Sequence, residues 1–430
     1  MRISSLHRAG FAFFLVKASE KCYDKKQKGT VNPMKQKLLF VMSSMKSGGG
    51  ERSLLTLLTL LDYDRYDVDL FLFDRSGLFF DMIPKQVHIL PHSREYSYFT
   101  QPFPASVKLL AKHGNFSLLR NRLRYTKILR RYAANSLEAD AKAWQYFKPV
   151  FDKKSYDIAI GYLEGNPDYF VADCVNATKK IAWIHSDYSK LPADAESDLA
   201  FFEKVDNIVA VSPECTASLK KAFPSQANKI VTLENITSPT VIRTMAQAGD
   251  APELDEAVPC LLTIGRMAPP KGYDLALDAA EKLKKDGVRF KWFAIGQGEL
   301  KAQIEQSIAE KNLQDCFILL GERANPYPYF AKCDIYVQPS HYEGKSIALD
   351  ETKCFAKPIV ATKFSTVFDQ LTDGKTALLA EMSGDSIAEK IEALIQDEAL
   401  RKTLTENLQN EEIGNEAELK KFYALTEEKA

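Results

Sequence analysis

The part of the sequence that decides the fold is SHYEGKSIALDE, residues 340–351. A buried strand is predicted just before it and a helix with apolar spacing within it, so it forms a strand-to-helix turn. Glu343 then lies on the loop at the carboxyl edge of a sheet, and Glu351 lies about a turn inside the helix. The first N–H groups of that helix, near Ser346 and Ile347, suit a phosphate, because they lack partners and face the positive end of the helix dipole. A carboxylate one turn further along can accept hydrogen bonds from two ribose hydroxyls, so this turn predicts a nucleoside diphosphate site.

Two glycine turns upstream supply matching parts. One strand-like run ends in GRMAPPKG, residues 265–272, and another ends in GQGE, residues 296–299. Arg266 and Lys271 place two cations at the sheet edge, a planar fork and a mobile point charge that both suit phosphate. Glycine lets the backbone approach a ligand closely. Each feature alone is more often a solvated turn or a simple connector, but their order, each at a strand's carboxyl end, favours nucleotide-sugar binding.

These motifs resemble a known family. GRMAPPKG, GQGEL and SHYEGKSIALDE are similar, in order and spacing, to the C-terminal domain of family-4 retaining glycosyltransferases with the GT-B fold. MKSGGGER at residues 45–52 looks like the family's glycine loop after the first strand, and the resemblance runs from about residue 35 to about residue 400. It implies an α/β architecture of two Rossmann-like domains facing each other across a deep cleft. The Glu-Gly-Lys-Ser variant looks like a subgroup found in bacterial capsule and cell-wall polysaccharide clusters.

The resemblance also implies roles for individual residues. Arg266 and Lys271 would bind the donor diphosphate, Glu343 would lie beneath the donor sugar, and Glu351 would hold the ribose hydroxyls. His185 resembles the family's cleft histidine that contacts the donor sugar. The alternative is a structural histidine whose hydrogen bonds are made within the core. The catalytic residues implied are therefore Glu343, Arg266, Lys271 and His185. The donor-binding residues implied are Gly49, Gly265, Gly296, Gly344, Lys345, Ser346, Ile347 and Glu351.

The activity implied is transfer of a glycosyl group from a nucleotide sugar to an acceptor hydroxyl with retention of anomeric configuration. UDP is the commonest nucleotide in the family, and a lipid-linked or polysaccharide acceptor is expected. No metal and no cofactor are expected, since the two cations and the helix start can offset the charge of the leaving group. The alternative is a catalytically silent GT-B protein that binds and stabilises a partner glycosyltransferase. The presence of Arg266, Lys271, Glu343 and Glu351 argues against that alternative.

Bulk properties agree with a two-domain cytoplasmic enzyme. The chain has 430 residues, with 57 Lys and Arg against 57 Asp and Glu, so no overall charge favours nucleic acid. Its seven cysteines show no metal-binding or redox spacing and are expected to be reduced thiols. No apolar run reaches the roughly 20 residues of a membrane span. We expect the protein in the cytoplasm; the alternative location is the inner face of the cell membrane, where it would bind peripherally.

Alternating strands and helices predict two parallel sheets. Strands are expected at residues 38–42, 68–73, 87–90, 158–162, 180–185, 207–211 and 229–233, and then at 260–264, 291–295, 317–320, 334–338, 359–361 and 377–379. The domains expected are a disordered or non-native extension at 1–33, an acceptor domain at 34–246, a linker at 247–259, a donor domain at 260–400 and a helical segment at 401–430. By family analogy, the last segment could return to the first domain.

One region carries an unusual charge pattern. Between residues 105 and 132 there are eight Lys or Arg residues and no Asp or Glu, interleaved with apolar side chains. This pattern indicates a basic amphipathic helix. Such a helix can lie on an anionic membrane surface, or it can be a solvated face over its own domain. We favour the membrane, because family members often act on lipid-linked acceptors.

Overall fold

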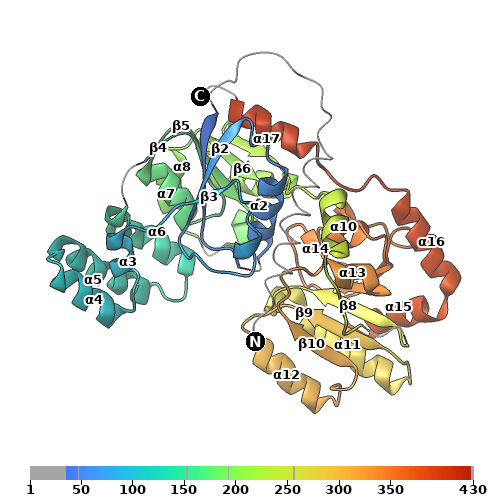
Figure 1. Cartoon of the computed structure of the whole chain (residues 1–430). Coiled ribbons are helices and arrows are strands. Elements are labelled where there is room, and N and C mark those ends of the chain that lie inside the picture. Colours follow the sequence, from blue (N-terminus) through green and yellow to red (C-terminus); the bar gives the residue numbers. More distant parts are fainter. Residues whose placement is uncertain (1–34, 47, 152–153, 192, 255–256, 428–430) are drawn as a thin grey trace, which may run out of the picture. The chain divides into compact units, whose positions relative to one another are not determined.

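The computed structural model describes residues 35–46, 48–151, 154–191, 193–254 and 257–427. The predicted extension at 1–33 lies outside these residues. The chain divides into two compact units. The N-terminal unit consists mainly of residues 35–46, 50–235 and 417–427, and the C-terminal unit mainly of residues 236–416. Each unit is built on one parallel sheet with helices packed on it (Figure 1).

The sheet of the N-terminal unit has the strand order β3-β2-β1-β4-β5-β6-β7. All its pairs are parallel; Leu38, for example, lies opposite Val68 of one neighbour and Ile158 of the other. Central residues such as Phe40 are fully buried, as expected for a parallel sheet covered on both faces. The seven predicted strands are confirmed as β1 (Gln36–Met42), β2 (Tyr66–Leu72), β3 (His88–Ile89), β4 (Lys154–Gly161), β5 (Val175–Ile184), β6 (Asn207–Ala210) and β7 (Ile230–Thr232).

The sheet of the C-terminal unit has the order β10-β9-β8-β11-β12-β13, again with parallel pairs. Trp292 is fully buried at its centre, and its indole N–H donates to Thr263 Oγ1 at 3.0 Å. The six predicted strands are confirmed as β8 (Cys260–Ile264), β9 (Lys291–Ile295), β10 (Phe317–Gly321), β11 (Ile335–Gln338), β12 (Ile359–Thr362) and β13 (Leu378–Ala380). Two α/β units of this kind confirm the predicted fold class.

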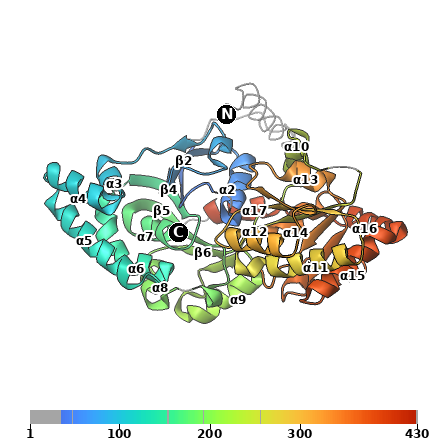
Figure 2. The same cartoon turned by 90° about the horizontal axis from the view of Figure 1, so that it is seen from below.

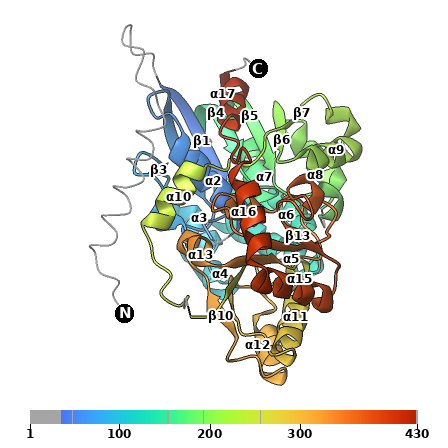
Figure 3. The ribbon, with the colours of Figure 1, turned by 90° about the vertical axis from the view of Figure 1, so that its right-hand side faces the viewer.

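Helices connect and cover the strands. In the N-terminal unit they are α2 (Gly49–Leu60), α3 (Arg94–Phe99), α4 (Phe103–Lys112), α5 (Phe116–Arg131), α6 (Ser136–Phe147), α7 (Asn166–Cys174), α8 (Ala195–Phe202) and α9 (Pro213–Ala222). In the C-terminal unit they are α10 (Pro239–Gln247), α11 (Tyr273–Lys285), α12 (Lys301–Glu310), α13 (Tyr327–Lys332), α14 (Ile347–Lys353), α15 (Gly384–Gln396) and α16 (Glu398–Gln409). Figure 3 shows α11 and α15 side by side in this unit.

The last described helix, α17 (Glu418–Glu427), packs on the sheet of the N-terminal unit (Figure 1). Phe422 stacks on Phe40 with 6.3 Å between ring centroids, and the hydroxyls of Tyr66 and Thr426 are 2.8 Å apart. The contacts of the chain change from one unit to the other between Asn235 and Ile236 and again after Glu416. The predicted boundary lies later, at 246, so α10 and the predicted linker at 247–259 are grouped with the C-terminal unit.

The basic region forms two helices, α4 and α5, rather than one (Figure 2). The chain turns at Gly114, whose φ of +72° suits glycine. Arg122 is the buried one among the eight Lys and Arg residues of this region, and it lies over the rings of Phe99, Phe103 and Tyr125, at 5.5 to 5.7 Å from their centroids. The prediction of a single helix is therefore wrong, because the sequence pattern did not reveal that Gly114 ends α4.

Candidate functional site

The candidate site of the C-terminal unit lies where its strand order reverses. Strands β8 and β11 are neighbours, but β9 continues the sheet on one side and β12 on the other. In open α/β sheets, ligands bind outside the carboxyl ends of the strands at such a switch point. Gly265 directly follows β8, and Glu343 lies on the loop after β11. The topology therefore brings the two predicted motifs to one edge.

Lys271 and Glu343 form the central contact of this edge. Lys271 Nζ donates to both carboxylate oxygens of Glu343, at 2.6 and 2.8 Å. The Glu343 side chain is only 10% exposed, so water screens this ion pair weakly. Gly272 holds Lys271 in place with a φ of +63°, and any Cβ there would overlap the carbonyl of Pro339. The close packing of this turn on the end of β11 explains why glycine follows Lys271.

Two side chains that the sequence interpretation missed also orient Glu343. Gln338 Nε2 and Ser340 Oγ donate to Glu343 Oε1 at 2.9 and 2.7 Å. Both residues are buried, and the hydroxyl of Tyr336 donates to Gln338 Oε1 at 2.7 Å. A glutamine inside an otherwise apolar strand was the signal available in the sequence. These contacts fix the carboxylate before any ligand is bound.

The backbones of two glycine turns meet beside this pair. Gly265 N–H donates to the carbonyl of Ile295 at 3.0 Å. Gly296 has a φ of +153°, and a Cβ there would overlap the carbonyl of Gly265. The Arg266 side chain is exposed and makes no hydrogen bond or ion pair with another described residue. Its guanidinium can therefore meet a phosphate without leaving another partner.

In the loop between Glu343 and α14, Gly344 is exposed with free space around it, whereas Lys345 and Ser346 contact neighbouring side chains. Gly344 is exposed, and a Cβ there would meet nothing within 4 Å. Lys345 Nζ lies 3.9 Å from Asp350 Oδ2. Ser346 caps α14, and its own N–H donates to Gln370 Oε1 at 3.0 Å, so a phosphate would compete with Gln370 for that donor. Ile347 begins the helix.

Glu351 is buried in α14 and is only 2% exposed. The hydroxyl of Tyr327, on α13, donates to Glu351 Oε1 at 2.8 Å. A buried carboxylate needs such donors, because an unpaired charge costs several kcal/mol. Tyr327 is a further residue that the sequence interpretation missed, since no local pattern connects α13 with α14.

In the N-terminal unit, His185 follows β5 at the carboxyl edge. Its backbone N–H donates to Glu164 Oε2 at 3.0 Å, and its Nε2 has no hydrogen-bond partner among the described residues. Burial lowers the pKa of His185 to about 4, although the negative charge of Glu164 opposes this shift. The imidazole is therefore neutral near pH 7. Gly49 is exposed and begins α2, after the loop that follows β1.

Within the described residues, no three His, Cys, Asp or Glu side chains are grouped as metal ligands would be. Asp67 and Asp69 lie in β2, where Asp69 accepts hydrogen bonds from Tyr156 and His88.

Comparison with known proteins agrees with this geometry. Residues 249–411 match the family model for glycosyl transferases group 1. An uncharacterized glycosyltransferase of Methanocaldococcus jannaschii is 34% identical over 34% of this chain and 41% of its own length. An N-acetylgalactosamine-N,N'-diacetylbacillosaminyl-diphospho-undecaprenol 4-alpha-N-acetylgalactosaminyltransferase of Campylobacter jejuni is 26% identical over 85% of this chain and 92% of its own length.

Solved structures show the same fold. A TarM mutant of S. aureus in complex with Fondaparinux, alpha-GlcNAc-glycerol and UDP has a TM-score of 0.61 at 17% identity, covering 91% of this chain and 100% of that one. HepE of Anabaena in complex with UDP has a TM-score of 0.56 at 17% identity, covering 91% and 99%. Together, these findings show that the chain has the GT-B fold of these solved structures and that residues 249–411, within the C-terminal unit, match the glycosyl transferases group 1 family.

Proposed function

We propose that this protein transfers a sugar from a UDP-sugar to an acceptor hydroxyl with retention of anomeric configuration. The observation that carries the proposal is the contact between Lys271 and Glu343 at the switch-point edge. Beside it lie the exposed cation of Arg266 and the two glycine turns, and Glu351 is buried on the next helix. These are the parts that a diphosphate, a sugar and a ribose require.

The residues would act on the donor as follows. The bond between the anomeric carbon and the phosphate oxygen breaks, and a bond to the acceptor oxygen forms on the same face. The departing phosphate oxygen takes the proton of the acceptor hydroxyl. Lys271 and Arg266 would offset the charge that develops on the departing diphosphate, which is the kind of interaction that most strengthens in a transition state. Glu343, already fixed by Gln338 and Ser340, would accept hydrogen bonds from the donor sugar.

UDP is proposed as the nucleotide because the solved structures of TarM and HepE that resemble this fold contain UDP. Glu351 would hold the two ribose hydroxyls. The Tyr327 hydroxyl donates to Glu351 Oε1 and orients the carboxylate.

The test is the thermal midpoint of the full chain, titrated with UDP, GDP and ADP and with 2′,3′-dideoxyuridine diphosphate. We expect UDP to raise the midpoint most, because a ligand that binds only the folded state stabilises it. The dideoxy analogue should bind roughly tenfold or more weakly, because it lacks both groups that Glu351 would bind.

Glu351→Ala should lose the preference for UDP over the dideoxy analogue, while Glu305→Ala, on the exposed surface of α12, should keep it. Equal binding of UDP and the dideoxy analogue would contradict the role of Glu351. A wild-type protein stabilised by no nucleotide would contradict the proposed function and favour a silent partner protein.

We further propose that the acceptor is lipid-linked or a polysaccharide and that α4 and α5 contact an anionic membrane. The name of the Campylobacter relative includes a diphospho-undecaprenol acceptor, and another relative is a capsular polysaccharide glycosyltransferase of Staphylococcus aureus. The other seven Lys and Arg residues of α4 and α5 are exposed, and Phe116 and Leu123 are 68% and 49% exposed. Among the described residues, no helix is both long and apolar enough to cross a bilayer.

Binding to vesicles of phosphatidylcholine with and without phosphatidylglycerol tests the membrane contact. The triple change Arg120→Glu, Arg124→Glu and Lys127→Glu should weaken binding to the anionic vesicles by more than about a hundredfold, since each lost cation near the surface contributes about 1 kcal/mol and each new carboxylate is repelled. The control reverses three exposed lysines of the C-terminal unit, Lys285, Lys301 and Lys402. Equal loss in both triple variants would contradict a specific contact through α4 and α5.

A further inference from the structure

A loop next to the candidate site of the C-terminal unit contacts the segment that joins its two glutamates. In the proposed function, Glu343 binds the donor sugar and Glu351 binds the ribose, so the separation of these two residues must fit one donor. The segment between them includes the exposed Gly344, where a Cβ would meet nothing within 4 Å. Because glycine restricts the backbone least, other contacts must fix this segment. They come from the loop after β12, whose residues 366–370 include η6 (Val367–Asp369) and are called the β12 loop here.

One residue of the β12 loop, Gln370, makes three hydrogen bonds to this segment. Its Oε1 accepts a hydrogen bond from Ser346 N–H at 3.0 Å, and its Nε2 donates to the Ser346 carbonyl at 2.8 Å. Nε2 also donates to Asp350 Oδ1 at 2.9 Å. Gln370 and Ser346 are both buried, so water does not readily replace these partners. At the other end of the loop, Thr366 Oγ1 donates to the Glu343 carbonyl at 3.1 Å.

These contacts connect the β12 loop to the chain at both glutamates. Thr366 binds Glu343 itself, and Gln370 binds Asp350, the residue that precedes Glu351 on α14. Different elements orient the two carboxylates, since donors come from β11 at the first and from α13 at the second. The β12 loop therefore relates the position of one carboxylate to that of the other.

The same contacts explain why this residue is a glutamine. A primary amide has one oxygen that accepts and two N–H groups that donate, and Gln370 uses all three groups. The Ser346 N–H can only donate and the Ser346 carbonyl can only accept, so the amide has one possible orientation. A glutamate would lose both donors and bring a second negative charge to Asp350. An apolar side chain would leave three polar groups without this partner.

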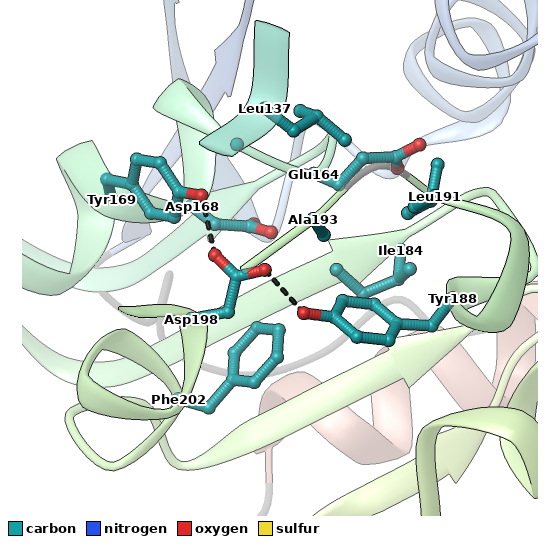
Figure 4. Close-up of a pocket in the computed structure, with 11 residues that line it drawn as sticks. Leu137, Glu164, Asp168, Tyr169, Ile184, Tyr188, Leu191, Ala193, Asp198 and Phe202 are labelled. Carbon is teal, nitrogen blue, oxygen red and sulfur yellow. Dashed lines mark hydrogen bonds between the residues drawn. The ribbon is translucent and has the colours of Figure 1, made fainter. Parts of the chain in front are cut away.

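A buried hydrogen-bond network in the N-terminal unit differs from this one in its position. There, Asp198 on α8 accepts hydrogen bonds from the hydroxyls of Tyr169 and Tyr188, at 2.6 and 2.7 Å (Figure 4). That network joins α8 to α7 and to the turn that contains Tyr188, and none of its three members is a candidate site residue. The network of the β12 loop instead lies between the two glutamates of the candidate site, so it can position them.

We propose that Gln370 is a positioning residue of the donor site, whose amide fixes the segment between Glu343 and Glu351 so that one UDP-sugar can contact both carboxylates. This inference rests on the proposed function, because it concerns the donor of the same reaction. Gln370 acts through Ser346 and Asp350 and makes no contact with the donor. Because Gln370 already uses the Ser346 N–H, the charge of the diphosphate is left to the cationic side chains of the site.

The test compares two ligands that differ by the sugar. In the proposed function UDP reaches only Glu351, whereas a UDP-sugar reaches both carboxylates. The ratio of the dissociation constant of the UDP-sugar to that of UDP therefore reports on the separation of the carboxylates, and a loss of stability alone would not change it. Isothermal titration calorimetry on the full chain measures both constants. The UDP-sugar is whichever of UDP-glucose, UDP-galactose and their N-acetylamino counterparts binds the wild type most tightly.

Changes at Gln370 should raise this ratio. Gln370→Met has a side chain of similar length without hydrogen-bonding groups of comparable strength. It should weaken binding of the UDP-sugar roughly tenfold and binding of UDP less than about threefold, because only the UDP-sugar needs both carboxylates in position. Gln370→Glu should weaken the UDP-sugar at least as much, since its carboxylate faces Asp350. Adding Asp350→Asn to Gln370→Glu should recover roughly fivefold, because the new amide can donate to the new carboxylate and the net charge of the pair is that of the wild type.

Two further variants separate positioning from folding. Thr366→Val removes the hydroxyl that donates to the Glu343 carbonyl, so it should weaken the UDP-sugar roughly threefold with UDP unchanged. It tests the β12 loop even if the Gln370 variants do not fold. Thr376→Val is the matched control and should keep the wild-type ratio. Thr376 is buried and its Oγ1 accepts a hydrogen bond from Thr372 N–H at 2.9 Å, but it lies before the amino end of β13, at the other edge of the sheet.

The outcomes distinguish the two proposals. A wild-type ratio in the folded variants of the β12 loop, an equal change in Thr376→Val, or no recovery on adding Asp350→Asn would overturn the positioning role of Gln370. A wild type that binds UDP but none of the UDP-sugars would overturn it as well, because the two carboxylates would then not hold one donor. A wild type that binds no UDP would overturn the proposed function instead. A raised ratio confined to the β12 loop variants, with recovery in the double variant, supports the inference.

Discussion

The carboxyl edges of the two sheets share a topology and differ in charge. Both sheets are parallel and reverse their strand order, next to β1 in one and next to β8 in the other. The edge of the C-terminal unit presents Arg266 and Lys271, whereas the edge of the N-terminal unit presents carboxylates and the neutral imidazole of His185. The fold thus supplies the same kind of position twice, and the side chains decide which part of a substrate each position can bind.

The two edges also differ in how far they are satisfied without a ligand. Glu343 receives donors from Lys271, Gln338 and Ser340, so the charge of its carboxylate is compensated within the edge of the C-terminal unit, and we call this edge the balanced edge. In the N-terminal unit, Asp168 Oδ2 and His185 Nε2 are buried without described partners. Changes to the first edge should therefore affect charge in the transition state, and changes to the second should affect binding and the response to pH.

Replacing the cation of the balanced edge should have the largest effect. Lys271→Ala should lower kcat/KM for the UDP-sugar by about a hundred- to a thousandfold, or about 3–4 kcal/mol, because a preorganised charge facing the leaving group is lost. Lys285→Ala, on the exposed face of α11, is the control. The measurement is UDP release at varied donor concentration. If Lys271→Ala stayed within about threefold of the control, the balanced edge would not be the catalytic one.

The buried His185 at the carboxyl edge of the N-terminal unit should make the stability of the fold depend on pH. The folded-state pKa of His185 is lowered to about 4 from 6.5, so between these values the unfolded chain binds a proton that the folded chain does not. The stability contributed by neutral His185 is fully present above pH 6.5 and is lost as the pH falls toward 4. The full loss is about 3 kcal/mol, at about 1.4 kcal/mol per pH unit.

His185→Asn removes this titration, so its thermal midpoint should fall less than that of the wild type between pH 7.5 and pH 4.5. Burial raises the pKa of Asp168 in both proteins, so that contribution cancels in the comparison. Parallel curves for the two proteins would show that His185 is not buried as a neutral group.

The strands of both edges were predictable because they are encoded locally. Most are short apolar runs that end at glycine or a polar residue, and all the predicted strands are present. The pairing of Lys271 with Glu343 spans 72 residues, and no local pattern contains it. The family resemblance placed both residues at one site but gave no contact between them. Gln338 and Ser340 were not predicted as its partners, because hydrogen bonds between side chains depend on rotamers that periodicity does not describe.

The burial of Asp168 in the N-terminal unit was missed for a different physical reason. Asp168 lies in the first turn of α7, where an acidic residue is ordinary and usually solvated. Its burial follows from close packing on Gly161, which only the three-dimensional structure shows. Likewise, the break between α4 and α5 depends on one glycine within a run whose charge pattern is continuous.

The smallest expected effect is on the KM for the UDP-sugar and concerns the partner of Glu351. Glu351 belongs to the balanced edge of the C-terminal unit and is buried. Tyr327→Phe removes the hydroxyl that donates to Glu351 Oε1. The KM for the UDP-sugar should rise about tenfold with little change in kcat, because a hydrogen bond to a charged group contributes about 1.5 kcal/mol and the ribose is held equally before and during the reaction.

Tyr329→Phe is the matched control on the same helix, since the Tyr329 hydroxyl donates to Glu253 Oε2 at 2.8 Å, away from Glu351. Initial rates of UDP release for both variants, measured over a range of donor concentrations, separate KM from kcat. A fall in kcat with unchanged KM would mean that Glu351 acts on the reacting atoms rather than on the ribose. An equal change in both variants would mean that packing of α13, and not the orientation of Glu351, controls the donor site. Only a rise in KM that is confined to Tyr327→Phe agrees with the proposed role of Glu351. In that role the Glu351 carboxylate is buried, but the Tyr327 hydroxyl orients it for the ribose.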